Sequence, residues 1–150
     1  AGNDIGKNNV GWSSADSAMV KLFRLLAVFF LAGWTVSTHG DDTSWLSRSG
    51  YYRVSYVSEL DPIEINRIHT WEFRVESSDG APVIGAILTA TGGMPLHNHG
   101  LPTAPRMTKD LGDGRYRFEG FRFHMKGEWE LFVTVDKAGR RDTVVIPLAI

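Results

Sequence analysis

The chain has 150 residues, of which 43% are hydrophobic and 22% charged, a composition typical of one globular domain. Its 16 basic and 17 acidic side chains nearly cancel, so no strong field is present that would attract nucleic acid. Cysteine is absent, which excludes thiolate metal sites and disulfides. A metal ion would have to be held by His, Met, Asp or Glu.

The first part of the chain predicts an export signal. Residues 1–18 are polar and rich in Gly, Asn and Ser, and we interpret them as a disordered leader or a misassigned start. Residues 19–37 begin with Met19, carry Lys21 and Arg24, and continue as an apolar run. The run is shorter than the roughly 20 residues of a membrane span, which favours a signal peptide over the alternative, an uncleaved membrane anchor. Either reading places the remainder in the periplasm or outside the cell.

Residues 38–50 predict a polar linker between this segment and the folded part of the chain. His39, Asp41 and Asp42 lie within it and offer a loose metal site as the alternative to a solvated tail. We therefore expect the folded domain to occupy residues 51–150.

The pattern of residues 51–150 is that of β-structure. Apolar and charged residues alternate at period two over residues 69–76, which predicts a strand with one buried face. Residues 83–91 are less polar throughout, which favours a central position in a sheet. The other strands are predicted at residues 51–57, 106–111, 115–125, 129–135 and 142–150. About seven short strands with turns between them and no helix predict an all-β fold, an antiparallel β-sandwich.

The predicted strand at 115–125 changes phase at Glu119 and Gly120. Tyr116 and Phe118 share one parity, whereas the next two phenylalanines along the strand share the other. A β-bulge that contains a glycine produces such a slip. We therefore predict a bulge at this point.

Soft donor side chains gather around a proline-rich loop. Met94, His97 and His99 lie within six positions, and the two histidines point to the same side if the loop is extended. His124 and Met125 follow later in the chain and would face opposite ways on a regular strand. Imidazole and thioether together favour copper over zinc, because thioether is a poor zinc ligand. We predict a copper site with ligands among these five residues.

Other side chains near this pattern have alternatives that stay open. His69 shares the parity of the buried residues of its strand, so a core histidine is the alternative to a ligand. For Met107 and Met125, a position in the core is the alternative to a role as ligand. Trp129 either covers a Cu(I) ion with its ring face or fills the core.

No catalytic constellation emerges. The serines at 13, 14, 44 and 47 lie in the leader or linker, where nothing would hold a triad. Glu128 and Glu130 share the polar parity of a strand, which favours a solvated face over an acid and base pair. We expect no enzymatic activity.

Arginines at 106, 115, 117 and 122 are interpreted as the polar face of a sheet, with a docking surface for an acidic partner as the alternative.

A set of ordered motifs resembles the YtkA-like and FixH-like domains. The motifs are HTW at 69–71, DGAPV at 79–83, GA at 85–86, GGMP at 92–95, HNHGLPT at 97–103, PR at 105–106, GDGRY at 112–116, FHM at 123–125 and GEWEL at 127–131. The resemblance covers about residues 65–136. It implies an Ig-like β-sandwich that is exported or membrane-anchored and is associated with copper handling and the assembly of copper-containing oxidases. It also implies Met94, His97, His99 and His124 as ligands.

Two functions are consistent with these residues. The first is an exported copper-binding or copper-handling accessory protein whose partners are the copper ion and a protein in a membrane or extracellular complex. The alternative is an interaction module without metal, which would dock through the proline-rich loop and the aromatic strand at 116–123. A sandwich that carries another ligand has no distinguishing residue in its favour.

Overall fold

The computed structural model of the chain describes Gly2 and residues 43–150. The chain divides into Ala1–Gly40 and Asp41–Ile150, and the predicted signal or anchor segment at 19–37 lies outside the described residues. Within the part of the chain that is described, no helix is long and apolar enough to cross a membrane.

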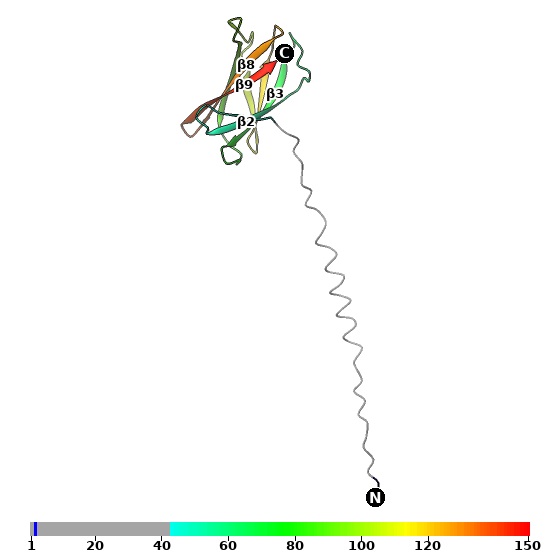
Figure 1. The fold of residues 1–150 in the computed structure, drawn as a ribbon, viewed down its shortest axis with the longest axis vertical. Helices are drawn as coiled ribbons and strands as arrows, with labels where there is room; N and C mark the ends of the chain where they lie inside the picture. The colour runs from blue at the N-terminus through cyan, green and yellow to red at the C-terminus, as the bar shows by residue number, and fades with distance from the viewer. Residues whose placement is uncertain (1, 3–42) are drawn as a thin grey trace. The chain divides into compact units, whose positions relative to one another are not determined.

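The unit Asp41–Ile150 consists of two antiparallel sheets (Figure 1). One sheet has the strand order β1-β2-β3-β7-β6 and the other β5-β4-β8-β9. Their bounds are β1 Trp45–Leu46, β2 Tyr52–Ser58, β3 His69–Ser77, β4 Ile87–Met94, β5 His99–Gly100, β6 Arg106–Gly112, β7 Arg115–Phe121, β8 Glu128–Lys137 and β9 Arg140–Ala149. Seven of these strands have seven or more residues, whereas β1 and β5 have two each. The predicted all-β sandwich is confirmed.

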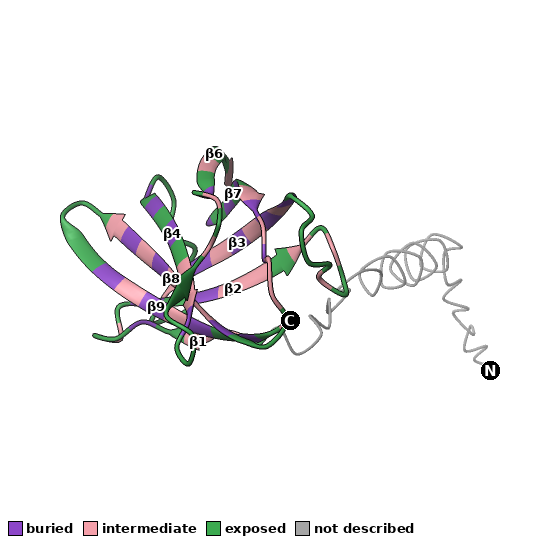
Figure 2. Cartoon of the chain, turned by 90° about the horizontal axis from the view of Figure 1, so that it is seen from above, coloured by how far each residue is buried: buried purple, intermediate pink, exposed green. Residues whose placement is uncertain are grey.

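Alternating burial along the strands places the core between the two sheets. Buried and partly exposed residues alternate along β3 and β8, as the banded colouring in Figure 2 shows. Trp71 of β3 is fully buried, and its ring stacks on Tyr56 at 4.3 Å and on Phe121 at 4.7 Å between ring centres. Burial of such large rings is the main stabilising contribution to a domain of this size.

The predicted β-bulge is confirmed at Gly120. His69 pairs with Phe121 and the next residue of β3 pairs with Glu119, so Gly120 has no partner in the register. Its φ of 94° is one that glycine adopts at little cost. The slip allows Phe118 and Phe121 both to point into the core.

β7 is shorter than predicted. The sequence predicted a strand over 115–125, but β7 ends at Phe121, which pairs with His69, the first residue of β3. Phe123 instead accepts a hydrogen bond from the backbone N–H of Asn66, at 2.7 Å. His124 and Met125 therefore lie in a loop and not on a strand.

β4 differs from the prediction in its bounds, since a strand was predicted at 83–91 and β4 begins at Ile87. The segment before Ile87 is tied to the other sheet, since the Tyr116 hydroxyl donates to the carbonyl of Val83 at 2.6 Å and accepts from the N–H of Ala86 at 3.0 Å. β4 has β8 along one edge, but β5 covers the other edge only at its last two residues. β4 therefore lies between two strands, as predicted, but one of its edges is unpaired from Ile87 to Thr91.

The folded unit begins before residue 51, within the segment that was predicted to be a linker. Trp45 of β1 stacks on Tyr56 at 5.7 Å, and β1 pairs with β2. The buried hydroxyl of Ser47 accepts a hydrogen bond from the N–H of Tyr52 at 2.9 Å. The N–H of Arg48 donates to the carbonyl of Thr143 in β9 at 3.0 Å.

Asp142 holds this first segment against β9. Its carboxylate accepts from the N–H of Ser49 at 2.9 Å and from that of Thr143 at 2.8 Å. Burial raises the pKa of Asp142, but hydrogen bonds from Ser47 and from these N–H groups outweigh it and hold the pKa below its ordinary value. The ionised carboxylate therefore stabilises the fold above the unfolded pKa of about 3.9, and this contribution is lost as the pH falls through the lower folded value.

We expect Asp142→Asn to lower the free energy of unfolding by about 2 kcal/mol at neutral pH, because two charge-assisted hydrogen bonds are weakened. The difference from the parent chain should shrink as the pH falls through the folded pKa, because the parent carboxylate then also becomes neutral. Urea unfolding at neutral pH and in acid measures it. Asp113→Asn, in an exposed turn, is the matched control and should change stability by less than about 0.5 kcal/mol. A difference that persists undiminished in acid would contradict this role of Asp142.

Candidate metal centre

Three of the predicted ligands lie side by side where β4 ends and β8 begins. His97 sits in the turn between β4 and β5, whose first hydrogen bond runs from the N–H of His97 to the carbonyl of Met94 at 3.2 Å. His99 begins β5 and pairs with Met94. The ring centres of His97 and His99 are 6.4 Å apart, and those of His99 and His124 are 5.8 Å apart.

His124 reaches this position because its loop is fixed on both sides. The carbonyl of Phe123 is bound by Asn66, and the carbonyl of Met125 accepts a hydrogen bond from the indole N–H of Trp129 at 3.2 Å. The Trp129 side chain is buried, and its ring meets the His124 imidazole edge to face at 5.6 Å. The core of the sandwich therefore sets the orientation of this imidazole.

The three imidazoles differ in exposure. His97 and His99 are exposed, whereas His124 is half-buried. The Nδ1 atom of His124 is shielded from solvent and has no hydrogen-bond partner among the described residues. A shielded ring nitrogen without a partner costs free energy, and a bound cation would satisfy it if the imidazole is neutral.

The distances decide how many imidazoles can share an ion without rearrangement. Metal–nitrogen bonds of about 2 Å keep the ring centres of two imidazoles on one ion within about 6 Å of each other. The pair His99 and His124 meets this limit, and the pair His97 and His99 exceeds it slightly. Over Gly2 and residues 43–150, no group of three or more His, Asp, Glu or Cys side chains is arranged to hold a metal ion.

The thioethers do not join the imidazoles. Met94 is only 3% exposed, and its methyl group lies against Gly127, where an added Cβ would approach it to 3.0 Å. Met125 and Met107 pack against the hydrophobic core. The mixed cluster of imidazoles and thioethers that the sequence predicted is therefore absent from the described residues, because burial of these apolar side chains in the core is favourable.

His69 is a core histidine. It is buried at 3% exposure, and its Nδ1 atom lies 3.1 Å from the carbonyl of Arg67. The structure thus resolves the alternative between ligand and core residue in favour of the core.

Glu130 was not among the predicted site residues. It lines a hollow of about 330 Å³ together with His99 and Asn98. β8 places it opposite Gly93, which has no side chain to cover it. The period-two pattern of β8 indicated only a polar face, and the place of Glu130 opposite Gly93 could be found only from the register between β4 and β8.

Two antiparallel sheets, with three neighbouring imidazoles at one end, define a β-sandwich domain with a candidate binding site. The chain belongs to the YtkA-like family, whose model matches residues 49–134 and so covers all the predicted ligands. Among curated proteins, none matches the chain. Among solved structures, the chain is similar to the crystal structure of a DUF4426 family protein from Pseudomonas aeruginosa PAO1. That similarity has a TM-score of 0.47 at 13% identity and covers 67% of this chain and 91% of the other.

Proposed function

We propose that the chain is an exported copper-binding accessory protein whose primary ligands are His99 and His124. The observation that supports this most directly is the 5.8 Å separation of their ring centres, which are contributed by two separate segments. The shielded Nδ1 atom of His124 has no partner among the described residues, and a metal ion bound to this nitrogen would supply one.

The donor set suits copper in either oxidation state. Imidazole is a common copper ligand. Two imidazoles bound on opposite sides of one Cu(I) ion would have their ring centres at about the separation observed for His99 and His124. His97 is exposed and free to turn towards the ion as a third ligand.

Titration of the purified chain with Cu(I), in competition with a chromophoric chelator, tests the proposal. We expect one equivalent of Cu(I) to bind. We expect the Cu(I) affinity of the double variant His99→Ala, His124→Ala to fall by more than the roughly 10–100-fold that removal of an outer-sphere partner costs. Leu96→Ala, at an 82% exposed position of the same turn, is the matched control and should bind as the parent does. Uptake of no copper, or equal affinity in the double variant, would contradict the proposal.

Export and a protein partner in a membrane or extracellular assembly belong to the same proposal, since copper accessory proteins must pass the ion on. The role we propose is binding and transfer, without catalysis. Fractionation of cells that produce the full chain tests the location. Recovery of the chain in the cytoplasm alone would contradict export.

A further inference from the structure

Two outer strands of the sandwich carry features that discourage pairing, whereas most of one edge of β4 is open. β6 carries Lys109 and Asp110 and shifts register twice against β7, and β9 contains Pro147. Short strands, charges, irregular register and proline all discourage pairing with another chain. β4 has none of these devices, since Ile87–Met94 reads ILTATGGM. Its free edge is therefore competent to pair.

The backbone groups on this free edge can be identified from the register. The N–H of Leu101 donates to the carbonyl of Gly92 at 3.0 Å, so the backbone groups of Gly92 point to the β5 side. Alternation along an antiparallel strand directs those of Leu88 and Ala90 to the same side. From Ile87 to Thr91, the described residues provide a partner strand only on the β8 side. Two donors and two acceptors thus face outward.

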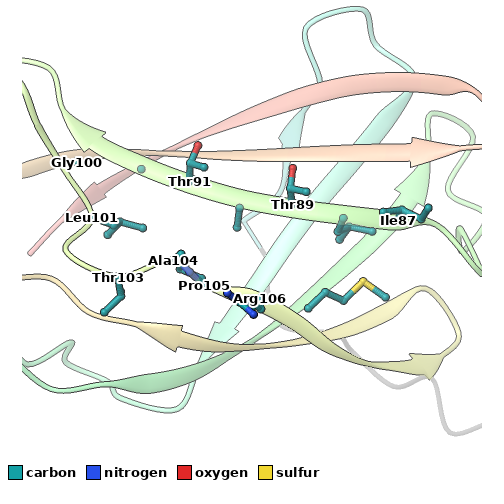
Figure 3. Close-up of a pocket in the computed structure, with 13 residues that line it drawn as sticks. Ile87, Thr89, Thr91, Gly100, Leu101, Thr103, Ala104, Pro105 and Arg106 are labelled. Carbon is teal, nitrogen blue, oxygen red and sulfur yellow. The ribbon is translucent and has the colours of Figure 1, made fainter.

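A groove of about 730 Å³ lies along this edge (Figure 3). Residues 100–106 run along the opposite side and contribute the apolar side chains of Leu101, Ala104 and Pro105. The open part of β4, from Ile87 to Thr91, spans about 13 Å at 3.3 Å per residue. The groove therefore has the length of an extended segment of about five residues.

Arg106 is the one charged residue that lines the groove. It is exposed, and no ion pair to it is formed by the residues that the structure describes. An apolar groove with a single free guanidinium is complementary to an apolar segment that carries one carboxylate.

We propose that the β4 edge binds an extended, apolar peptide segment of a partner protein, which carries an acidic residue and adds as a further strand to the four-stranded sheet. The main-chain hydrogen bonds would supply affinity, and the side chains in the groove would supply specificity. The proposal rests on the β4 edge and Arg106. It is independent of the copper site, so either proposal can fail alone.

The test uses the full chain, labelled with nitrogen-15, and the capped peptide acetyl-Ser-Thr-Val-Glu-Val-Thr-Ser-amide at up to about 5 mM, a range that detects Kd values near 1 mM. We expect the amide signals of Leu88 and Ala90 to move and their hydrogen exchange to slow by at least about 10-fold. Those of Thr89 and Thr91, which face β8, should change less. No response at these positions would overturn the proposal.

Two controls separate strand addition from other forms of binding. The same peptide with methylated nitrogens at both Val residues and at Glu cannot donate these hydrogen bonds and should not bind; equal binding would overturn strand addition.

Arg106→Gln should weaken the binding of the Glu peptide about 3-fold, as expected for an exposed ion pair. It should leave the binding of a peptide with Gln in place of Glu unchanged. Equal weakening of both peptides would overturn the acidic requirement. Protection of Leu88 and Ala90 that grows with protein concentration in the absence of peptide would identify a second copy as the occupant and overturn the proposal.

Discussion

We expect Gly114→Ala to destabilise the domain by about 4 kcal/mol, which is a large part of the roughly 5–15 kcal/mol that stabilises a domain. Gly114 has φ +70°, which costs a residue with a Cβ about 1–2 kcal/mol. An added Cβ would also lie 2.5 Å from the carbonyl oxygen of Val75 and 3.2 Å from the Cβ of Pro82. Relief of that clash adds about 1–3 kcal/mol.

The clash acts on a junction between segments. The N–H of Val75 donates to the carbonyl of Gly114 at 2.8 Å, and that of Val83 donates to the carbonyl of Val75 at 3.0 Å. The backbone at Gly114 therefore cannot move without loss of hydrogen bonds that join β3 to the segment that leads into β4. This is why local relaxation should recover little of the cost.

Gly112→Ala is the matched control in the same turn. Gly112 has φ +77°, and nothing lies within 4 Å of an added Cβ. We expect a loss of only about 1 kcal/mol, the cost of the backbone conformation alone. Urea unfolding of both variants measures the difference. Equal losses would show that strain at positive φ, and not the contact with Val75, limits substitution at Gly114.

Trp71→Ala is expected to cost about 4 kcal/mol, within the range for removal of a large buried ring. Trp71 is 0% exposed and lies among Tyr56, Phe73 and Phe121, at ring-centre distances of 4.3, 5.8 and 4.7 Å. Tyr56 and Phe121 come from the strands on the two sides of β3, so the surrounding sheet cannot collapse into the cavity without loss of its hydrogen bonds.

Trp71→Phe should cost no more than about 1.5 kcal/mol. It keeps an aromatic ring in the site and removes the indole N–H, which is buried without a hydrogen-bond partner in the described part of the chain. Denaturant unfolding of the two variants, with Tyr51→Ala as an exposed aromatic control, measures the effect. A loss for Trp71→Phe as large as that for Trp71→Ala would show that cavity size does not set the cost at this position.

The aromatic core also links these predictions to the candidate metal centre. The Trp71 ring lies 6.2 Å from Phe123, and Phe123 meets Trp129 edge to face at 5.2 Å. Trp129 in turn supports the imidazole of His124. Variants at Trp71 should therefore be compared for copper affinity only under conditions in which the domain remains folded.

The two proposed surfaces share β4 and meet at β5. His99 begins β5, and its neighbour Gly100 lines the groove along the open edge. A peptide bound to β4 would therefore end close to the imidazole of His99. If both proposals hold, a partner that docks on this edge is positioned beside the copper ligand that would release the ion.

Much of the fold was predictable from the sequence, because strands leave a local signal. The alternation in residues 69–76 reflects the geometry of a single strand with one buried face, and β3 confirms it. The phase slip at Gly120 is equally local, since one extra residue reverses the side chains that follow. Both features depend on neighbours along the chain and on nothing further away.

The site and the open edge depended on tertiary structure. The sequence supplied the identity of the candidate ligands, but it could not show that His99 and His124 would be neighbours or that Met94 would turn into the core. Those outcomes are set by the register between β4 and β8 and by the loop that Trp129 and Asn66 hold in place. Likewise, the apolar character of β4 suggested a central strand, and β4 does lie between β5 and β8, but the shortness of β5 leaves most of one edge of β4 open. Local periodicity determines which face of a strand is buried, but only long-range pairing decides which strands, loops and side chains meet.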